Sequence, residues 1–154
     1  RFKFRNLKYG GFCTFGSGEK NWNPFDIYYM ECRKAAQRTK GITRTYFVEK
    51  LSDLQRTLLR TQMKADVEGG VHVLICPFEK VNNDLKEPYF GIWDDEYICF
   101  VHYHPTGSMD EIILDGRPEV IALAQEQERL VRKYSIVITD VDRDLDKYIR
   151  VASS

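Results

Sequence analysis

Residues 88–101 read PYFGIWDDEYICFV, and this stretch decides the fold that we expect for the chain. Aromatic and β-branched residues lie on both sides of Asp94 and Asp95. Such residues favour strands, and Asp favours tight turns. The stretch therefore predicts a β-hairpin with the acidic pair at its tip and a longer second arm, from Tyr97 to His104.

The residues before the hairpin predict a strand, a helix and a second strand. Ile42 to Val48 is a β-branched and aromatic run, and Ser52 with Gln55 forms a capping box for a helix. The nearly unbroken apolar run from Val71 to Cys76 is typical of a strand covered on both faces. These residues therefore predict two parallel strands joined by a helix.

The remaining periodic segments fit the same kind of sheet. They are a strand at Phe12–Phe15, a helix opened by Asn23 and Pro24, a strand at Glu111–Leu114, a helix from Pro118, a strand at Ile136–Ile138 and a short helix at Asp142–Ile149. We therefore expect an α/β fold: one domain over residues 1–154, with a mixed sheet of about six strands and helices on both faces.

The order of these elements, with the acidic hairpin, resembles the phospholipase-D-like, or HKD, superfamily. The resemblance spans roughly Phe25 to Tyr134. The active motif of that family is His, any residue, Lys, four residues and Asp. The resemblance implies a scaffold in which paired His residues act on a phosphodiester and Lys stabilises the phosphate charge.

This chain lacks the cationic residues of that motif. With Asp94 as the motif Asp, the His and Lys positions hold Glu87 and Tyr89. With Asp95 in that place they hold Pro and Phe. We therefore expect no catalytic residues and a domain that keeps the scaffold without the chemistry.

The segment His102-Tyr103-His104 is the second candidate for chemistry. On a strand, residues two apart point to the same face, so His102 and His104 can share a phosphate or a metal. An active phosphodiesterase or nuclease that uses these two residues is the alternative function. Catalytic zinc usually has three protein ligands, so we expect no metal and no cofactor. We expect the third histidine, His72, in the core.

Charge is divided unevenly along the chain. Residues 1–64 hold 14 Lys and Arg against five Asp and Glu, and residues 65–154 hold nine against 18. A nucleic-acid-binding surface is the third hypothesis, because basic residues interleaved with aromatic ones suit phosphate contact and base stacking. The simpler interpretation is a solvated basic rim. The residues concerned are Arg33, Lys34, Arg38, Lys40 and Arg44.

The function that we expect is a non-catalytic sensory or interaction domain of a larger signalling or regulatory protein. It would bind a small ligand or a partner chain. Ligands of α/β sheets lie outside the carboxyl ends of the strands. We therefore expect Arg44 on the rim of one strand and the segment from Asp94 to His104 near the other end of the site. The predicted ligand-binding residues are Arg44, Asp94, Asp95, His102 and His104.

Cysteine spacing and hydropathy indicate the cellular environment that we expect for the protein. The four cysteines have no CxxC spacing, which favours reduced thiols in a cytoplasmic protein. No apolar run approaches the roughly 20 residues of a membrane span. The chain begins with Arg, and we expect a piece of a longer protein. Domains of the HKD family commonly pair, and this chain holds one copy. We therefore expect a homodimer, with an interface that includes aromatic residues of the apolar hairpin arm or of the helix that contains Val120.

Overall fold

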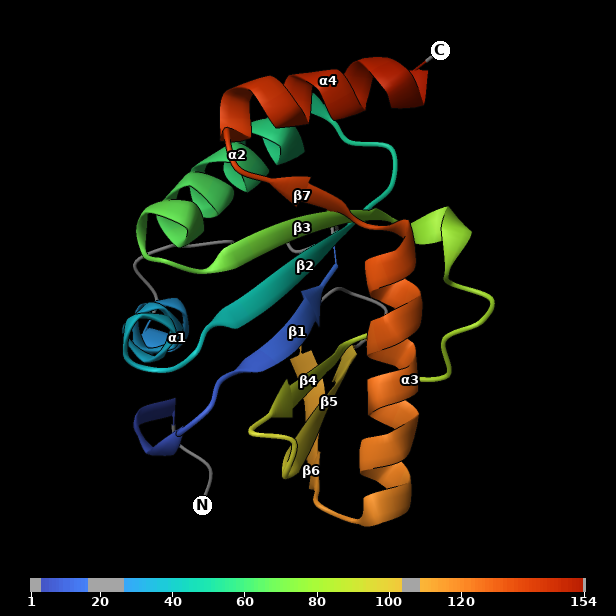
Figure 1. Ribbon diagram of the computed structural model, residues 1–154. Helices are drawn as coiled ribbons and strands as arrows, with labels where there is room; N and C mark the ends of the chain where they lie inside the picture. Colours follow the sequence, from blue (N-terminus) through green and yellow to red (C-terminus); the bar gives the residue numbers. More distant parts are fainter. Residues whose placement is uncertain (1–3, 17–26, 104–108, 154) are drawn as a thin grey trace.

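The computed structural model describes residues 4–16, 27–103 and 109–153. A seven-stranded sheet in the order β6-β5-β4-β1-β2-β3-β7 forms the centre of the molecule (Figure 1). The strands are β1 (Gly11–Phe15), β2 (Ile42–Val48), β3 (His72–Pro77), β4 (Phe90–Trp93), β5 (Tyr97–Tyr103), β6 (Met109–Asp115) and β7 (Ile136–Ile138). The mixed α/β sheet is confirmed, with seven strands rather than about six.

Four α-helices and two short 3-10 helices connect the strands. They are η1 (Phe4–Asn6), α1 (Ile27–Arg38), α2 (Asp53–Glu68), η2 (Phe78–Lys80), α3 (Pro118–Tyr134) and α4 (Val141–Ser153). Local signals set several of these boundaries. The predicted capping box of α2 is formed, since Ser52 Oγ accepts from Gln55 N at 3.2 Å and Gln55 Oε1 accepts from Ser52 N at 3.0 Å.

The strand directions define two edges of the sheet. β1, β2 and β3 are parallel, and β4 is antiparallel to β1. Because β5 is in turn antiparallel to β4, it runs in the same direction as β1. We call the edge where β1, β2, β3 and β5 end the carboxyl edge, and the edge where they begin the amino edge. The hairpin tip between β4 and β5 lies at the amino edge.

Helices cover both faces of the sheet, as predicted. In Figure 1, α1, α2 and α4 lie on one side of the sheet and α3 lies on the other. Alternate strand residues supply the two cores, as the two-residue repeat of a strand requires. Ile42 packs in the core that contains Leu59 of α2, whereas Phe47 packs in the core that contains Val131 of α3. Fully burying such a side chain stabilises the fold by roughly 1.5–3 kcal/mol.

The indole of Trp93 ties the hairpin to β1 and to the N-terminal segment. It lies so close to the strand backbones that a Cβ at Gly91 would come within 2.8 Å of its Nε1, and one at Gly11 within 2.5 Å of its Cε3. The ring of Phe4 meets it edge-on at 5.0 Å. Glycine at both positions therefore makes room for the buried indole.

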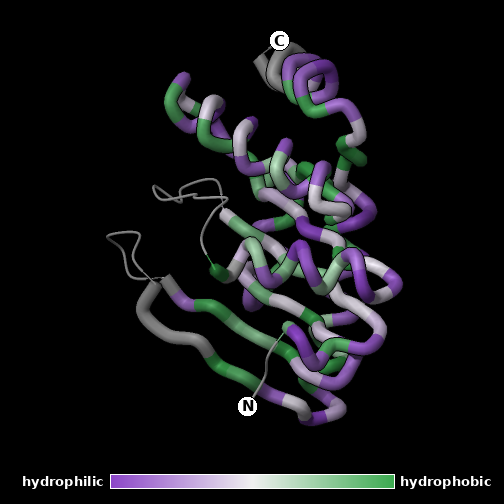
Figure 2. Tube along the Cα trace, turned by 90° about the vertical axis from the view of Figure 1, so that its left-hand side faces the viewer, coloured by the Kyte–Doolittle hydropathy of each residue, from purple (hydrophilic) through white to green (hydrophobic). Residues whose placement is uncertain are grey.

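The strands β5 and β6, at the end of the sheet opposite β7, have exposed apolar side chains. Figure 2 shows a hydrophobic stretch along these strands. Tyr97 is 48% exposed and Leu114 is 54% exposed. In the described part of the chain, no helix is apolar over a length that would cross a membrane.

Candidate functional site

The structure separates the residues that the sequence places at one site. Asp94 and Asp95 form the hairpin tip at the amino edge, whereas His102 lies near the end of β5 at the carboxyl edge. The predicted placement of the whole segment near one end of a site is therefore wrong. An antiparallel hairpin carries its tip and its open end to opposite edges of the sheet. His104 lies outside the described residues.

Asp94 and Asp95 are turn residues. Both have left-handed backbones, with φ of 57° and 54°, and Glu96 N donates to Trp93 O at 3.1 Å to close the turn. A type I′ hairpin turn requires positive φ at both central positions, which Asp tolerates better than most residues. This confirms the acidic turn.

The Asp94 carboxylate also anchors the N-terminal segment. Its Oδ2 accepts from Lys8 N at 2.9 Å, and its Oδ1 accepts from Tyr9 N at 2.8 Å and from Gly10 N at 3.0 Å. Burial alone would raise the pKa of Asp94, but these backbone donors outweigh it and hold the pKa below its ordinary value. Asp94 therefore has a structural task, which a lone carboxylate in the sequence does not reveal.

A small open cleft of about 210 Å³ lies beside this turn. Some of its charged residues already make contacts within the chain. Arg132 Nε donates to Glu128 Oε2 at 2.7 Å, and the Arg132 guanidinium lies 4.9 Å from the Phe12 ring. Asp95 Oδ1 accepts from Gln125 Nε2 at 3.3 Å. The lining residues are Tyr9, Gly10, Gly11, Phe12, Ile92, Asp94, Asp95, Glu128 and Arg132.

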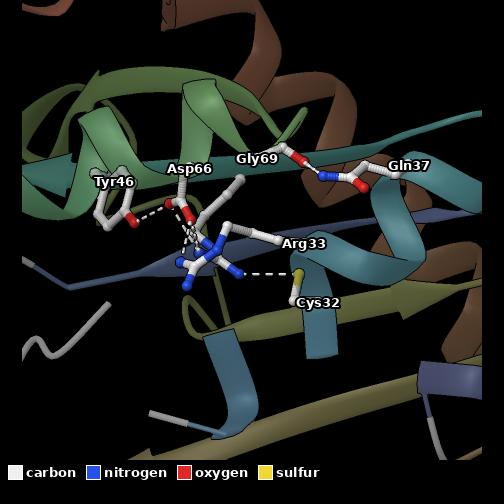
Figure 3. Close-up of polar contacts among 7 residues, drawn as sticks. Cys32, Arg33, Gln37, Tyr46, Asp66 and Gly69 are labelled. Carbon is white, nitrogen blue, oxygen red and sulfur yellow. Dashed lines mark hydrogen bonds and ion pairs between the residues drawn. The ribbon is translucent and has the colours of Figure 1, made fainter. Parts of the chain in front are cut away.

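Arg44 is in the interior and not on a rim, so its predicted placement is wrong. It is fully buried, and its Nη1 donates to both carboxylate oxygens of Asp66 at 2.7 and 2.8 Å. Its Nη2 donates to Cys32 Sγ at 2.9 Å, and Tyr46 Oη donates to Asp66 at 2.6 Å (Figure 3). Arg44 stands in the middle of β2, where its side chain reaches α1 and α2 rather than the strand end.

The buried site keeps the guanidinium charged. Burial opposes its charge, but the carboxylate of Asp66 lies against the guanidinium and outweighs that effect, so the pKa of Arg44 is raised well above its ordinary value. The rings of Phe15 and Tyr29 lie 5.1 and 4.9 Å from the guanidinium carbon and add cation–π contacts. This network links β2 to both neighbouring helices.

The other members of the basic cluster are also engaged within the chain. Arg33 Nη1 lies 3.8 Å from Asp66 Oδ1, and Lys34 Nζ donates to Glu31 Oε1 at 3.0 Å. Arg38 donates to the carbonyl oxygens of Phe4 and Leu7, and Lys40 lies 5.8 Å from the ring centroid of Tyr9. Of these contacts, those of Arg33 and Lys34 are with carboxylates and offset part of the positive charge of the cluster.

His102 and Glu87 form a polar pair at the carboxyl edge. His102 Nε2 lies 2.9 Å from Glu87 Oε2, and the two side chains are 36% and 37% exposed. Glu87 is the residue in the motif His position when Asp94 is taken as the motif Asp. A comparison with the motif shows only that Glu87 stands where a His is expected. It does not reveal the contact with His102, 15 positions later, because that contact depends on the hairpin.

Tyr89 holds the motif Lys position and belongs to an aromatic cluster. Its ring stacks on Phe78 at 6.3 Å and meets Phe47 edge-on at 6.2 Å. A Cβ at Gly16 would lie 2.9 Å from the Tyr89 ring, so glycine permits this close approach. The carboxyl edge therefore presents a carboxylate, an imidazole and aromatic rings.

The cysteines and the third histidine differ in their exposure. Cys13, Cys32 and Cys76 are buried free thiols and Cys99 is half-buried. Burial raises the pKa of Cys13 to about 12, so it remains protonated. His72 is exposed on β3, so its predicted core position is wrong.

Within residues 4–16, 27–103 and 109–153, no three His, Cys, Asp or Glu side chains gather into a metal-binding group. The hypothesis of a metal shared by His102 and His104 also needs a residue outside these ranges. It therefore stays untested.

Comparison with known proteins supports the fold alone. No protein-family model and no curated protein matches the sequence. The crystal structure of phosphatidylserine synthase from Haemophilus influenzae matches 97% of this chain, with a TM-score of 0.56 at 13% identity. This chain spans 41% of that protein, so the likeness covers less than half of it. At this identity the likeness supports the α/β fold, and the phospholipase-D-like resemblance stays a prediction.

Proposed function

We propose that this chain is a non-catalytic phospholipase-D-like domain that binds a small ligand at the carboxyl edge through Glu87 and His102. One observation carries the proposal: the motif His position holds a carboxylate that is hydrogen-bonded to an accessible imidazole. The pair lies at the carboxyl edge of the sheet, and α/β sheets bind ligands beyond that edge.

The charge of this edge disfavours phosphodiester chemistry. Phosphoryl transfer needs cationic donors on the phosphate oxygens. Here Glu87 is acceptor-only when ionised and repels an anion, and Tyr89 is packed among aromatic rings. The same carboxylate favours a ligand with hydrogen-bond donors, such as an amine or an amide group.

A binding experiment tests the site. Ethylammonium and acetamide are titrated into the protein, with inorganic phosphate as the anionic probe, and the His102 ring signals are followed by NMR. We expect the two donors to shift these signals and Glu87→Gln to weaken that response. Asp95→Asn, at the amino edge, is the matched control and should leave it unchanged. A response to phosphate alone would contradict the proposal.

A hydrolytic assay tests the absence of catalysis. A chromogenic phosphodiester and a plasmid are incubated with the protein, with and without divalent metal, and we expect no turnover. The second candidate function is a phosphodiesterase in which Glu87 orients His102 as a general base, as a carboxylate does in catalytic triads. Turnover that disappears in His102→Ala would favour that candidate.

The wider setting that we propose is a sensory or interaction domain within a larger regulatory protein, associated as a homodimer. The exposed apolar residues of β5 and β6 support the homodimer. A nucleic-acid surface has less support, because the basic cluster is engaged in contacts within the chain. A steep loss of nucleic-acid affinity with salt would restore that hypothesis.

A further inference from the structure

A single buried side chain of α3 makes hydrogen bonds to the backbone of Glu87. Gln127 of α3 is 4% exposed. Its Oε1 accepts from Glu87 N at 3.2 Å, and its Nε2 donates to Glu87 O at 3.0 Å. A carboxamide offers both a donor and an acceptor, so Gln127 satisfies both backbone groups of a residue that precedes β4 and has no strand partner there.

A second buried side chain holds the same segment from β1. Thr14 is 5% exposed. Its hydroxyl donates to Pro88 O at 2.6 Å and accepts from Phe90 N at 3.1 Å. Residues 87–90 are therefore fixed from two elements by four hydrogen bonds, immediately beside the exposed carboxylate.

We infer that Gln127 and Thr14 are positioning residues, which hold residues 87–90 so that the Glu87 carboxylate stays on Nε2 of His102. The inference rests on the proposed function in treating this pair as the binding site. A binding site gains affinity when its groups are fixed before the ligand arrives, because less ordering is needed on binding. If Gln127 and Thr14 only satisfied backbone groups, they would stabilise the fold, but their loss would not change the surroundings of the His102 imidazole.

The tautomer of His102 reports on this positioning without any ligand. When the imidazole is neutral, a carboxylate that accepts from Nε2–H favours the tautomer with the proton on that nitrogen. We expect ¹⁵N spectra of histidine-labelled protein to show this tautomer, with the signal assigned by its loss in His102→Gln. Glu87→Gln sets the scale for a pair without its carboxylate.

The first test variant is Gln127→Met, which fills a similar volume and makes no hydrogen bond. We expect it to change the His102 signal by at least half of the change in Glu87→Gln while circular dichroism shows a folded protein. Gln125→Met, at a half-buried position of α3 that does not contact Glu87, is the matched control and should leave the signal unchanged.

The Thr14 variants carry the test if Gln127→Met does not fold. Thr14→Val removes both hydrogen bonds and should shift the His102 signal, whereas Thr14→Ser keeps the hydroxyl and should not. Folded variants of Gln127 and Thr14 with a wild-type His102 signal would overturn the positioning role. Because this readout needs no ligand, its failure is distinct from a failure of ethylammonium to bind, which would overturn only the proposed function.

Discussion

At the scale of single residues, Asp94 and Asp95 have identical side chains but different structural roles. Both residues adopt the left-handed backbone of the turn. Asp94 directs its carboxylate at three backbone N–H groups of residues 8–10, whereas Asp95 is exposed and contacts Gln125 at 3.3 Å. The hairpin therefore needs the carboxylate of one residue and only the turn propensity of the other.

This division predicts different costs for the same substitution at the two positions. Asp94→Asn should lower the free energy of unfolding by about 1–2 kcal/mol, because charge-assisted hydrogen bonds are weakened at a partly solvated site. Asp95→Asn should change it by less than about 0.5 kcal/mol, as for an ordinary surface site. Urea unfolding measures both, and equal costs would contradict the anchoring task of Asp94.

The lowered pKa of Asp94 also predicts a pH dependence. A carboxylate with a depressed folded-state pKa stabilises the fold above its unfolded value, about 3.9, and loses that effect as the pH falls through the folded value. The stability difference between wild type and Asp94→Asn should therefore be constant from about pH 7 to 5 and shrink below about pH 4. Other carboxylates cancel in this difference. A gap that persists at about pH 2 would contradict the assignment.

At the scale of elements, the buried Arg44–Asp66 pair joins β2 to α2. Breaking a buried ion pair from one side leaves an uncompensated charge, which typically costs about 3–5 kcal/mol. Asp66→Asn should destabilise the fold by about that amount, because Arg44 is fully buried. Asp53→Asn, on the exposed first turn of α2, is the matched control and should cost less than about 0.5 kcal/mol. Thermal and urea unfolding compare the two variants.

Local signals in the sequence predict the elements well but not the contacts between them. The capping box of α2 and Pro118 at the start of α3 lie within one turn of the boundaries that they set, so the sequence alone indicates them. Arg44 looks like a rim residue because its partner Asp66 lies 22 residues away. Glu87 becomes a site residue only when the hairpin brings His102 to it. Pairing across the sheet is a property of register, which single residues do not encode.

At the scale of the whole molecule, the element order predicts the α/β fold, and the charge at the carboxyl edge supports the proposed class of ligand. The strand order places the Glu87 and His102 pair at one edge and the acidic turn at the other. On the proposed function, a carboxylate at this edge favours a ligand with hydrogen-bond donors, since function depends on the site rather than on the fold.

The surface of β5 and β6 carries the last prediction, a homodimer in solution. The apolar face of α3 packs on the sheet through Ala124 and Val131, which are fully buried, so it is not free for a partner. The surface of β5 and β6, where Leu114 of β6 is 54% exposed, remains available for association. Leu114→Lys should therefore shift sedimentation equilibrium towards the 18.1 kDa monomer. Leu54→Lys, at a more exposed position on α2, should not. Wild-type protein that sediments as a monomer at every concentration would exclude the dimer, because an interface that buries apolar side chains must respond to mass action.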